Sequence, residues 1–321
     1  MFSFRLCGAN RLRVGVLSLL LVAACVRPGA NEFVVYQSAF NESYQVGQLV
    51  LDKLAVAERK AFANARQPIA PGTVYFDPGE ARYLADRVDP PATASLRKSL
   101  DIVKSYTETV SALATGESAT AIAGRLTEIG TTAASVAVQV TTPISSGQKA
   151  VVDKLAQKTQ PLRALEPITA LGFGVLTRAE FRRTVVAEAD TIDTIFSEII
   201  ELTGHRSDPA FASKIGSDPG RACFDSARVS IFCLLIDDLI FEADGVGGLK
   251  PFNKEQVARV EGLQVLLANW VVLLQSTRTA LDQSVTAIEN RQSRANSTSI
   301  LKAISEMDAA AKGVRDVLAE Q

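Results

Sequence analysis

Histidine, a common metal ligand and general base, occurs only once in this chain, as His205. One imidazole cannot supply the paired or triple histidines of the common zinc and di-iron sites. His205 directly follows Gly204 at a predicted helix end, where capping of the last carbonyl groups or solvent exposure is its expected role. The sequence therefore predicts no metal site, no cofactor and no catalytic residue.

Two groups of carboxylates could bind a cation or act as acids. The first group recurs at three-to-five-residue spacing beside an apolar stripe, a pattern typical of a solvated helix face. The second, Asp237-Asp238, interrupts an apolar run, so that a buried carboxylate there needs an Arg or Lys partner from another helix. We expect a solvated helix face for the first group and a structural ion pair for the second. The first group comprises Asp190, Asp193, Glu198 and Glu201.

A glycine cluster at 244–248, Asp-Gly-Val-Gly-Gly, contains the GxG of phosphate-binding loops. It follows a predicted helix, whereas a phosphate cradle requires a strand, a loop and then a helix. The pattern favours a helix end followed by a turn. Serine and lysine are abundant, but no motif marks a catalytic Ser–Lys pair, and an enzyme with an unmarked site stays an open alternative.

The first 25 residues have the composition of an export signal. Arg5, Arg11 and Arg13 give this segment a positive start without any acidic residue, and Val14–Ala24 is then free of charge. These eleven apolar and small residues are about half of the ~20 needed to span a bilayer as a helix. The pattern is typical of a signal peptide and not of a transmembrane helix.

The end of this segment, Leu21-Val22-Ala23-Ala24 leading directly into Cys25, resembles the lipobox of bacterial lipoproteins. The resemblance implies diacylglyceryl transfer to the Cys25 thiol, cleavage after Ala24 and acylation of the new amino terminus by palmitate or a similar chain. Val26, not Asp, follows the cysteine, which implies the outer membrane as destination. Three acyl chains exceed what stable anchoring requires. An ordinary secretory signal with an incidental cysteine is the alternative.

Two cysteines, Cys223 and Cys233, remain after the leader is removed and Cys25 is acylated. Two cysteines in an oxidising compartment can form a disulfide. The run 224–241 looks helical, however, and ten helical residues rise about 15 Å, beyond the ~7 Å limit between bridged Cα atoms. A disulfide would require Cys223 to fold back from a loop, so we expect two unpaired, buried thiols.

The elements that must position these residues are helices. Apolar residues recur at spacings of three and four through nearly all of the mature chain, and sustained period-two alternation is missing. Two proline- and glycine-rich loops, 67–91 and 205–222, interrupt the pattern, and Gly116 ends one helix. The predicted helices span 31–66, 91–115, 122–142, 146–158, 181–203, 224–243, 253–290 and 297–319.

The longest predicted helix, 253–290, has apolar residues close to a heptad repeat, as in a coiled coil. Its stretch Leu263–Thr277 carries no charge at all. Fifteen residues are too few for a comfortable membrane span. We therefore expect this helix at the centre of the bundle, apolar on all sides, with Trp270 buried.

Charge and composition exclude two further classes of protein. Lys and Arg number 34 against 35 Asp and Glu, a net charge of −1, and the mature chain, which loses three arginines, has 31 against 35 and a net charge of −4. Such a balance gives no electrostatic attraction for nucleic acid. A chain that is 47% apolar and 21% charged is not globally disordered.

The sequence thus predicts an all-α protein, an elongated antiparallel bundle of about seven or eight helices. Residues 1–24 are its signal peptide, 25–30 a lipidated tether and 31–321 one bundle domain. The predicted function is binding or scaffolding in the bacterial envelope, with membrane lipid as a partner through acylated Cys25 and an envelope protein as another. The first alternative is a membrane-active protein resembling α-helical pore formers, with Ile129–Thr177 as its inserting hairpin, and the enzyme with an unmarked site is the second.

Overall fold

The computed structural model describes residues 30–65, 77–137, 146–169, 177–204, 230–236, 252–290 and 297–320. These residues form nine α-helices and two 3-10 segments and contain no strand, so the predicted all-α class is confirmed. The long helices are α2 (Ala30–Ala65), α4 (Pro91–Thr115), α5 (Ala119–Ala137), α6 (Ser146–Thr159), α7 (Arg178–Thr203), α12 (Lys254–Asn290) and α13 (Ser297–Glu320). The short elements are α3 (Ala81–Leu84), α10 (Ile231–Leu235), η1 (Pro78–Glu80) and η3 (Gln160–Thr169).

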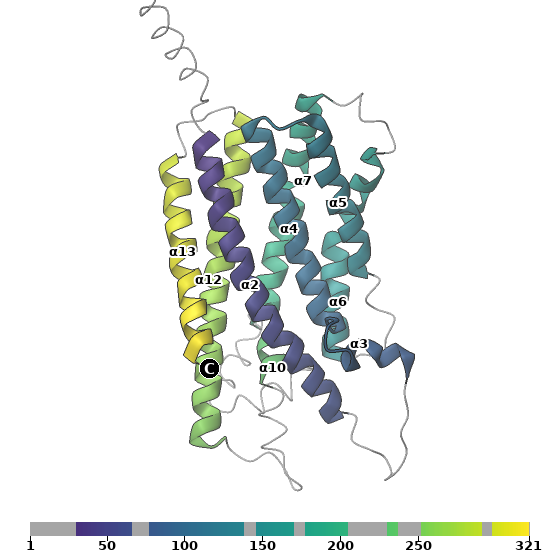
Figure 1. Ribbon diagram of the computed structural model, residues 1–321, viewed down its shortest axis with the longest axis vertical. Coiled ribbons are helices and arrows are strands. Elements are labelled where there is room, and N and C mark those ends of the chain that lie inside the picture. The colour runs from purple at the N-terminus through teal and green to yellow at the C-terminus, as the bar shows by residue number, and fades with distance from the viewer. Residues whose placement is uncertain are drawn as a thin grey trace, which may run out of the picture.

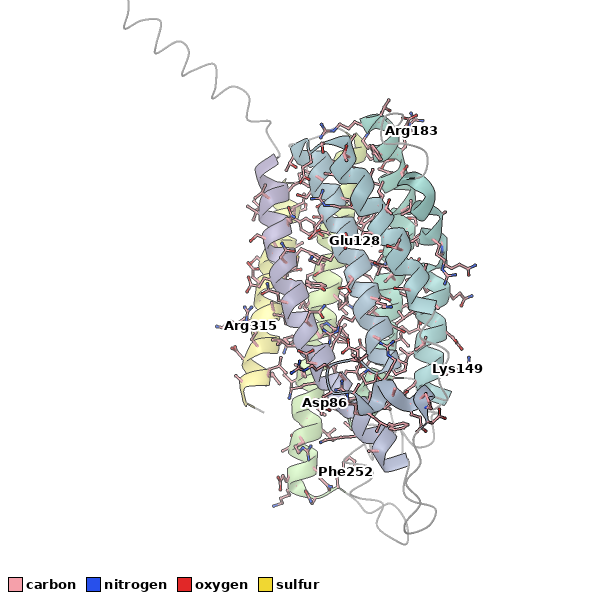
Figure 2. The ribbon with its side chains drawn as sticks, turned by 45° about the vertical axis from the view of Figure 1, so that its right-hand side comes forward. Asp86, Glu128, Lys149, Arg183, Phe252 and Arg315 are labelled. Atoms are coloured by element: carbon pink, nitrogen blue, oxygen red, sulfur yellow. The ribbon has the colours of Figure 1, made fainter. Side chains whose placement is uncertain are left out.

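The long helices lie side by side in one elongated bundle (Figure 1). Consecutive helices α4 and α5, and likewise α12 and α13, run antiparallel, whereas α2 and α13 pack together while running in the same direction. Charged side chains such as Glu128, Lys149, Arg183 and Arg315 project from the outside of the bundle (Figure 2). The bundle therefore has a solvated outer surface around an apolar interior.

One face of α2 is buried along its length, as the spacing of its apolar residues predicts. Tyr36, Phe40, Leu51 and Leu54 on this face are at most 4% exposed. The position one turn beyond Leu54 on the same face is occupied by Glu58, which is also fully buried. The carboxylate of Glu58 thus occupies a position where the apolar pattern of α2 predicts a hydrocarbon side chain.

The helix that the others surround is α4, which contacts α2, α5, α6, α7 and α12. Eighteen of its 25 residues are buried. Several of its hydroxyl groups donate to the carbonyl oxygen one turn earlier, as from Ser99 to Ser95 at 2.9 Å and from Thr109 to Ser105 at 2.7 Å. Gly116, with φ of 92°, ends the helix in the left-handed conformation, as predicted.

The uncharged stretch of α12 is buried on one side only. Trp270 is 1% exposed and Leu266 is fully buried, but Val265 and Val272 on the opposite side are 50% and 47% exposed. The expectation of burial on all sides is therefore wrong, because α12 and α13 form the edge of the bundle and leave an outer face to solvent (Figure 1). Among the described residues, α12 is also the one helix whose length and composition would suit a membrane span.

Cys233 is buried, 1% exposed, and it is disulfide-bonded, so the expectation of an unpaired thiol at this position is wrong. The reason lies in where its helix begins. Ser230 has an extended backbone, and its hydroxyl accepts the N–H of Cys233 at 3.1 Å, which makes it the N-cap of α10. A helix continuous through residue 230, on which the distance argument depended, does not exist. Cys223 lies outside the described residues.

The buried side of α12 gives a test of the core. Trp270→Ala is expected to lower the free energy of unfolding by about 3–5 kcal/mol, because a large aromatic group leaves a cavity. Val272→Ala on the exposed side of the same helix is the matched control, with an expected loss below about 0.5 kcal/mol. Chemical denaturation followed by circular dichroism measures both. A fluorescence maximum of native Trp270 like that of tryptophan in water would contradict burial.

Candidate functional site

One cavity is a groove between α2 and α12, to whose lining α10 and α13 also contribute. Its volume is about 790 Å³, within the range of pockets that hold small molecules. We call it the α2–α12 groove. Its lining residues are Asp52, Lys53, Val56, Ala57, Lys60, Leu235, Glu255, Ala258, Arg259, Gly262, Leu263 and Val317.

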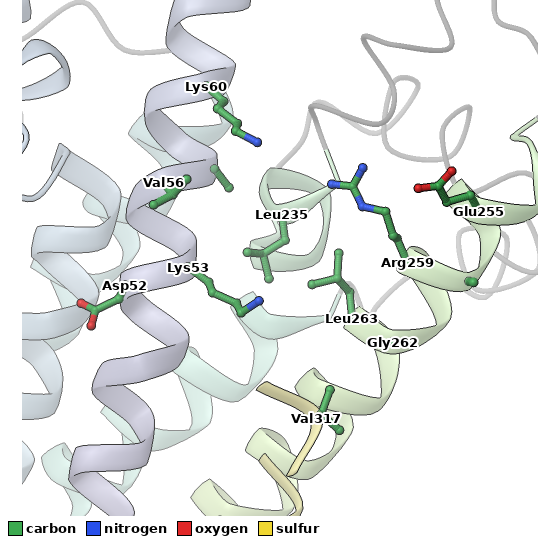
Figure 3. A pocket seen from close by; sticks show the side chains of 12 residues that line it. Asp52, Lys53, Val56, Lys60, Leu235, Glu255, Arg259, Gly262, Leu263 and Val317 are labelled. Carbon is green, nitrogen blue, oxygen red and sulfur yellow. The ribbon is translucent and has the colours of Figure 1, made fainter. Parts of the chain in front are cut away.

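Three basic side chains of the α2–α12 groove point toward its interior (Figure 3). Lys53 and Lys60 lie on one face of α2 because seven residues make about two helical turns. Arg259 reaches into the groove from α12 on the other side. Of the two acidic residues in the lining, Asp52 points away from the groove and forms an ion pair with Arg97 at 2.8 Å, whereas Glu255 lies on the same side of the groove as Arg259 (Figure 3).

The positive charges on the two walls influence each other. The pKa of the Lys53 ammonium group is lowered, chiefly because burial disfavours its charged form and further because the Arg259 guanidinium carries a like charge nearby. The groove therefore brings basic groups of two helices close to each other in a partly desolvated place.

Much of the remaining lining of the α2–α12 groove is apolar. Leu235 is 6% exposed and lies with Leu263 between the basic side chains of the two walls (Figure 3). Val56, 52% exposed, and Val317 extend the apolar surface along α2 and α13. Charged and apolar side chains therefore share the lining of the groove.

A second cavity, of about 630 Å³, lies between α4, α7 and α12. Its central feature is Arg278, which donates two hydrogen bonds to Asp193, one of them at 2.6 Å. Asp193 belongs to the acidic group singled out from sequence, and Asp190 and Asp282 also line this cavity. Because an arginine from another helix already pairs with Asp193, the arrangement fits a structural ion pair.

The other two acids of that group, Glu198 and Glu201, pair with Lys154 at 3.3 and 3.5 Å. The predicted solvated face does not hold for Glu198, which is only 6% exposed and is paired with Lys154. In the part of the chain that the structure describes, no three metal-ligating side chains come together. Five other sequence candidates, His205, Asp237, Asp238, the glycine cluster 244–248 and Cys25, lie outside that part.

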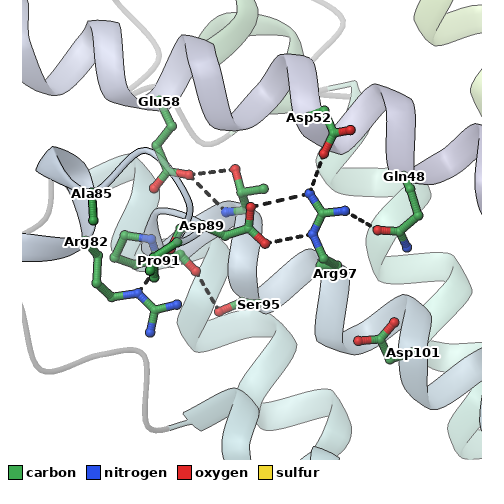
Figure 4. A network of polar contacts seen from close by, with 12 residues as sticks. Gln48, Asp52, Glu58, Arg82, Ala85, Asp89, Pro91, Ser95, Arg97 and Asp101 are labelled. Carbon is green, nitrogen blue, oxygen red and sulfur yellow. Dashed lines mark hydrogen bonds and ion pairs between the residues drawn. The ribbon is translucent and has the colours of Figure 1, made fainter.

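A polar network that joins α2 to the start of α4 was missed in the sequence (Figure 4). Its centre is Glu58, whose carboxylate accepts the backbone N–H groups of Ala92 and Thr93 at 3.0 and 2.9 Å and the Thr93 hydroxyl at 2.9 Å. The N-cap residue of α4, Pro90, offers no side-chain acceptor. Glu58 therefore supplies from another helix the cap that α4 lacks.

Arginines hold the segment that leads into α4. Arg59 donates to the carbonyl oxygens of Ala85, Asp86 and Val88, and Arg97 pairs with Asp89 at 2.7 Å. The backbone entering α4 is thus fixed from both α2 and α4. A hydrophilic residue at the next position of the α2 apolar stripe was the signal in the sequence that could have pointed to Glu58.

Burial is the main influence on Glu58 and raises the pKa of its carboxyl group, while the hydrogen bonds from Thr93 and Ala92 act in the opposite direction. A strongly perturbed pKa often marks a catalytic group. Glu58, however, is fully buried and lines neither cavity, so no substrate could reach it there. Its role is to stabilise the start of α4.

Comparison with known proteins identifies no relative. No family model matches the chain, and no curated protein and no solved structure resembles it.

The role of Glu58 can be tested by substitution. Glu58→Ala is expected to lower the free energy of unfolding by about 2–3 kcal/mol, because it leaves buried N–H groups at the α4 terminus without an acceptor. Glu58→Gln keeps an acceptor oxygen and is expected to lose less. Thermal unfolding of the three proteins at pH 7 measures the order, and equal losses for both variants would contradict capping.

The raised pKa of Glu58 also gives a pH dependence. Because its folded-state pKa lies above the unfolded value, folding favours the protonated form. The stability of the native protein relative to Glu58→Gln is then highest below the unfolded pKa of about 4.3 and declines as pH rises through the folded pKa. Denaturant titrations of both proteins between pH 4 and 8 measure this difference. A relative stability that rises with pH would show that hydrogen bonding outweighs burial.

Proposed function

We propose that this protein is a lipid-anchored component of the bacterial envelope, targeted to the outer membrane, that acts as a binding module and not as an enzyme. The observation that carries the binding role is the α2–α12 groove, where Lys53, Lys60 and Arg259 converge over an apolar wall. The lipobox-like segment ending in Cys25 supports the anchor.

The position of the groove fits a protein held at one end. Helix α2 begins at Ala30, five residues after Cys25, and a fully extended segment of this length spans at most about 18 Å. Asp52 and Lys60 follow Ala30 by 22 and 30 residues, which places them about 33–45 Å farther along α2. Anchoring at Cys25 would therefore keep one end of the bundle near the membrane and present the groove at the other.

The disulfide at Cys233 supports export from the cytoplasm. Disulfides persist in oxidising compartments such as the periplasm and are rare in the reducing cytosol. This support is independent of the signal peptide, because it comes from a buried residue of the mature bundle.

Membrane activity is the second candidate, and the composition of α12 is the observation in its favour. In the folded bundle the large residues of this helix, including Trp270 and Leu266, face the interior. The predicted inserting segment Ile129–Thr177 also carries Lys149, Asp153 and Lys154 in its middle. Each such charge costs roughly 2.5–3.5 kcal/mol at the centre of a membrane helix. A stable helical domain outside the bilayer is therefore the stronger proposal.

The anchor is tested by Cys25→Ser. The variant has no thiol to receive diacylglycerol, so it should take up no palmitate in metabolic labelling and should leave the membrane fraction after cell disruption. Cys7→Ser, within the leader, is the matched control and should label like the native protein. Palmitate retained by Cys25→Ser would remove the basis for the anchor.

Vesicle leakage separates the binding module from a pore former. The full mature chain carrying Cys25→Ser should release no dye from loaded liposomes at neutral or mildly acidic pH, because insertion would bring several charges into the bilayer. Val272→Asp, on the exposed face of α12, should not change that result. If the Cys25→Ser protein releases dye and the added Val272→Asp substitution abolishes this release, the pore-forming alternative is favoured.

A further inference from the structure

We infer that a small cavity in the core of the bundle binds one water molecule, which bridges the hydroxyl of Ser43 on α2 and the indole N–H of Trp270 on α12. The cavity lies between α2, α4, α7 and α12. It is separate from the α2–α12 groove, because no described residue lines both. We call it the core cavity.

The hydroxyl group of Ser43 is the observation that points to a ligand. Ser43 lines the core cavity and is 6% exposed, and its Oγ makes no hydrogen bond to any described residue. Other buried hydroxyls of the bundle, such as those of Ser99 and Thr277, donate to the carbonyl oxygen one turn earlier at 2.9 and 2.7 Å. A buried hydroxyl without a partner costs free energy. Ser43 therefore needs a partner that the described residues do not supply.

Trp270 brings a second polar group to the core cavity. Its indole Nε1 faces α2 beside Gly47, since a methyl group on Gly47 would lie 3.7 Å from it. Gly47 follows Ser43 by four residues and therefore lies on the same face of α2. The hydroxyl of Thr277, also in the lining, donates to Leu273 and keeps a lone pair that can accept. These groups give a water molecule the two to four polar partners that buried waters have.

Size and charge limit the occupant of the core cavity to water. About 20 Å³ is open to the centre of a water molecule, and one water needs roughly 10–15 Å³ of such space. The described residues that line the cavity include no charged side chain, so an ion would find no opposite charge there. A methyl group on Gly47 would take up part of this space, in ordinary contact with Leu100 at 3.5 Å.

An empty cavity is the alternative. Cavities that stay empty in proteins are lined by apolar groups, whereas the core cavity contains the unpartnered hydroxyl of Ser43. A water there would join the two helices that form the walls of the α2–α12 groove. Ser43 precedes Lys53 by ten residues on α2, and Trp270 follows Leu263 by seven residues on α12. The bridge would thus help to fix the spacing of the groove walls.

NMR spectroscopy tests for the water on the full mature chain carrying Cys25→Ser, which lacks only the acyl groups. Trp270 is the single tryptophan, so its indole N–H gives one signal in protein made with isotope-labelled tryptophan. A nuclear Overhauser cross-peak between water and this proton reports a water molecule that stays beside it while the protein tumbles. We expect the cross-peak in this parent protein and its loss in Gly47→Ala, whose methyl group fills the site.

Gly124→Ala is the matched control. Gly124 is also a helical glycine, in α5, and a methyl group on it would meet nothing within 4 Å. The cross-peak should therefore remain in this variant. Circular dichroism confirms that each variant is folded.

The unfolding equilibrium gives a second measure. Replacing a helical glycine by alanine lowers the unfolding constant up to about fivefold, and Gly124→Ala should show this gain. Gly47→Ala should gain about twofold less or lower still, because its methyl group expels the water and leaves Ser43 without a partner. Gly47→Ala should stabilise the Ser43→Ala protein more than it stabilises the parent, since no hydroxyl then loses a partner.

Three results would overturn the inference: no cross-peak in the parent protein, a cross-peak that survives Gly47→Ala, or a gain from Gly47→Ala as large as that from Gly124→Ala. A signal relayed by the Ser43 hydroxyl itself would survive Gly47→Ala, whereas a signal from a bound water would not. The measurement on the parent protein needs no variant and keeps the test valid if Gly47→Ala does not fold.

Discussion

The structure depends on one contact, in which the carboxylate of Glu58 caps the first turn of α4. Helix α4 touches five other long helices, so its starting point and direction decide where they can pack. Its own N-cap residue, Pro90, has no acceptor to offer, and Glu58 supplies one from α2. A buried carboxylate is costly, but here it ties the register of α2 to that of α4. The arginines on the preceding segment reinforce the same joint.

Packing around α4 uses small hydroxyl side chains as well as hydrocarbon. Thr93, Ser95 and Ser99 are fully buried, and hydrogen bonds to carboxylate or backbone oxygens satisfy their hydroxyls. Close approach recurs at the edge of the bundle, where a side chain on Gly313 of α13 would meet Asn269 of α12 at 2.6 Å. The bundle is therefore held by closely fitted helices, and large apolar residues such as Trp270 fill the wider spaces between them.

The spacing of apolar residues predicts most of the helices, because periodicity reports which face is buried. Pro91 and Gly116 mark the ends of α4 in the sequence as they do in the structure. The same reasoning is wrong for Cys233, since a helix start at Ser230 depends on a cap that apolar spacing does not reveal. The groove could not be predicted either. Lys53 and Arg259 are about two hundred residues apart, and only tertiary packing brings them together.

The distance between the start of α2 and the groove has a consequence for affinity. With Cys25 acylated, as we propose, the short tether and the stiff helix would confine the groove to a hemisphere about 6 nm in radius above its own membrane patch. One binding site in so small a volume corresponds to an effective concentration in the millimolar range. A ligand released from the same leaflet would then encounter the groove at this high local concentration, so that even a weak intrinsic affinity gives substantial occupancy of the groove.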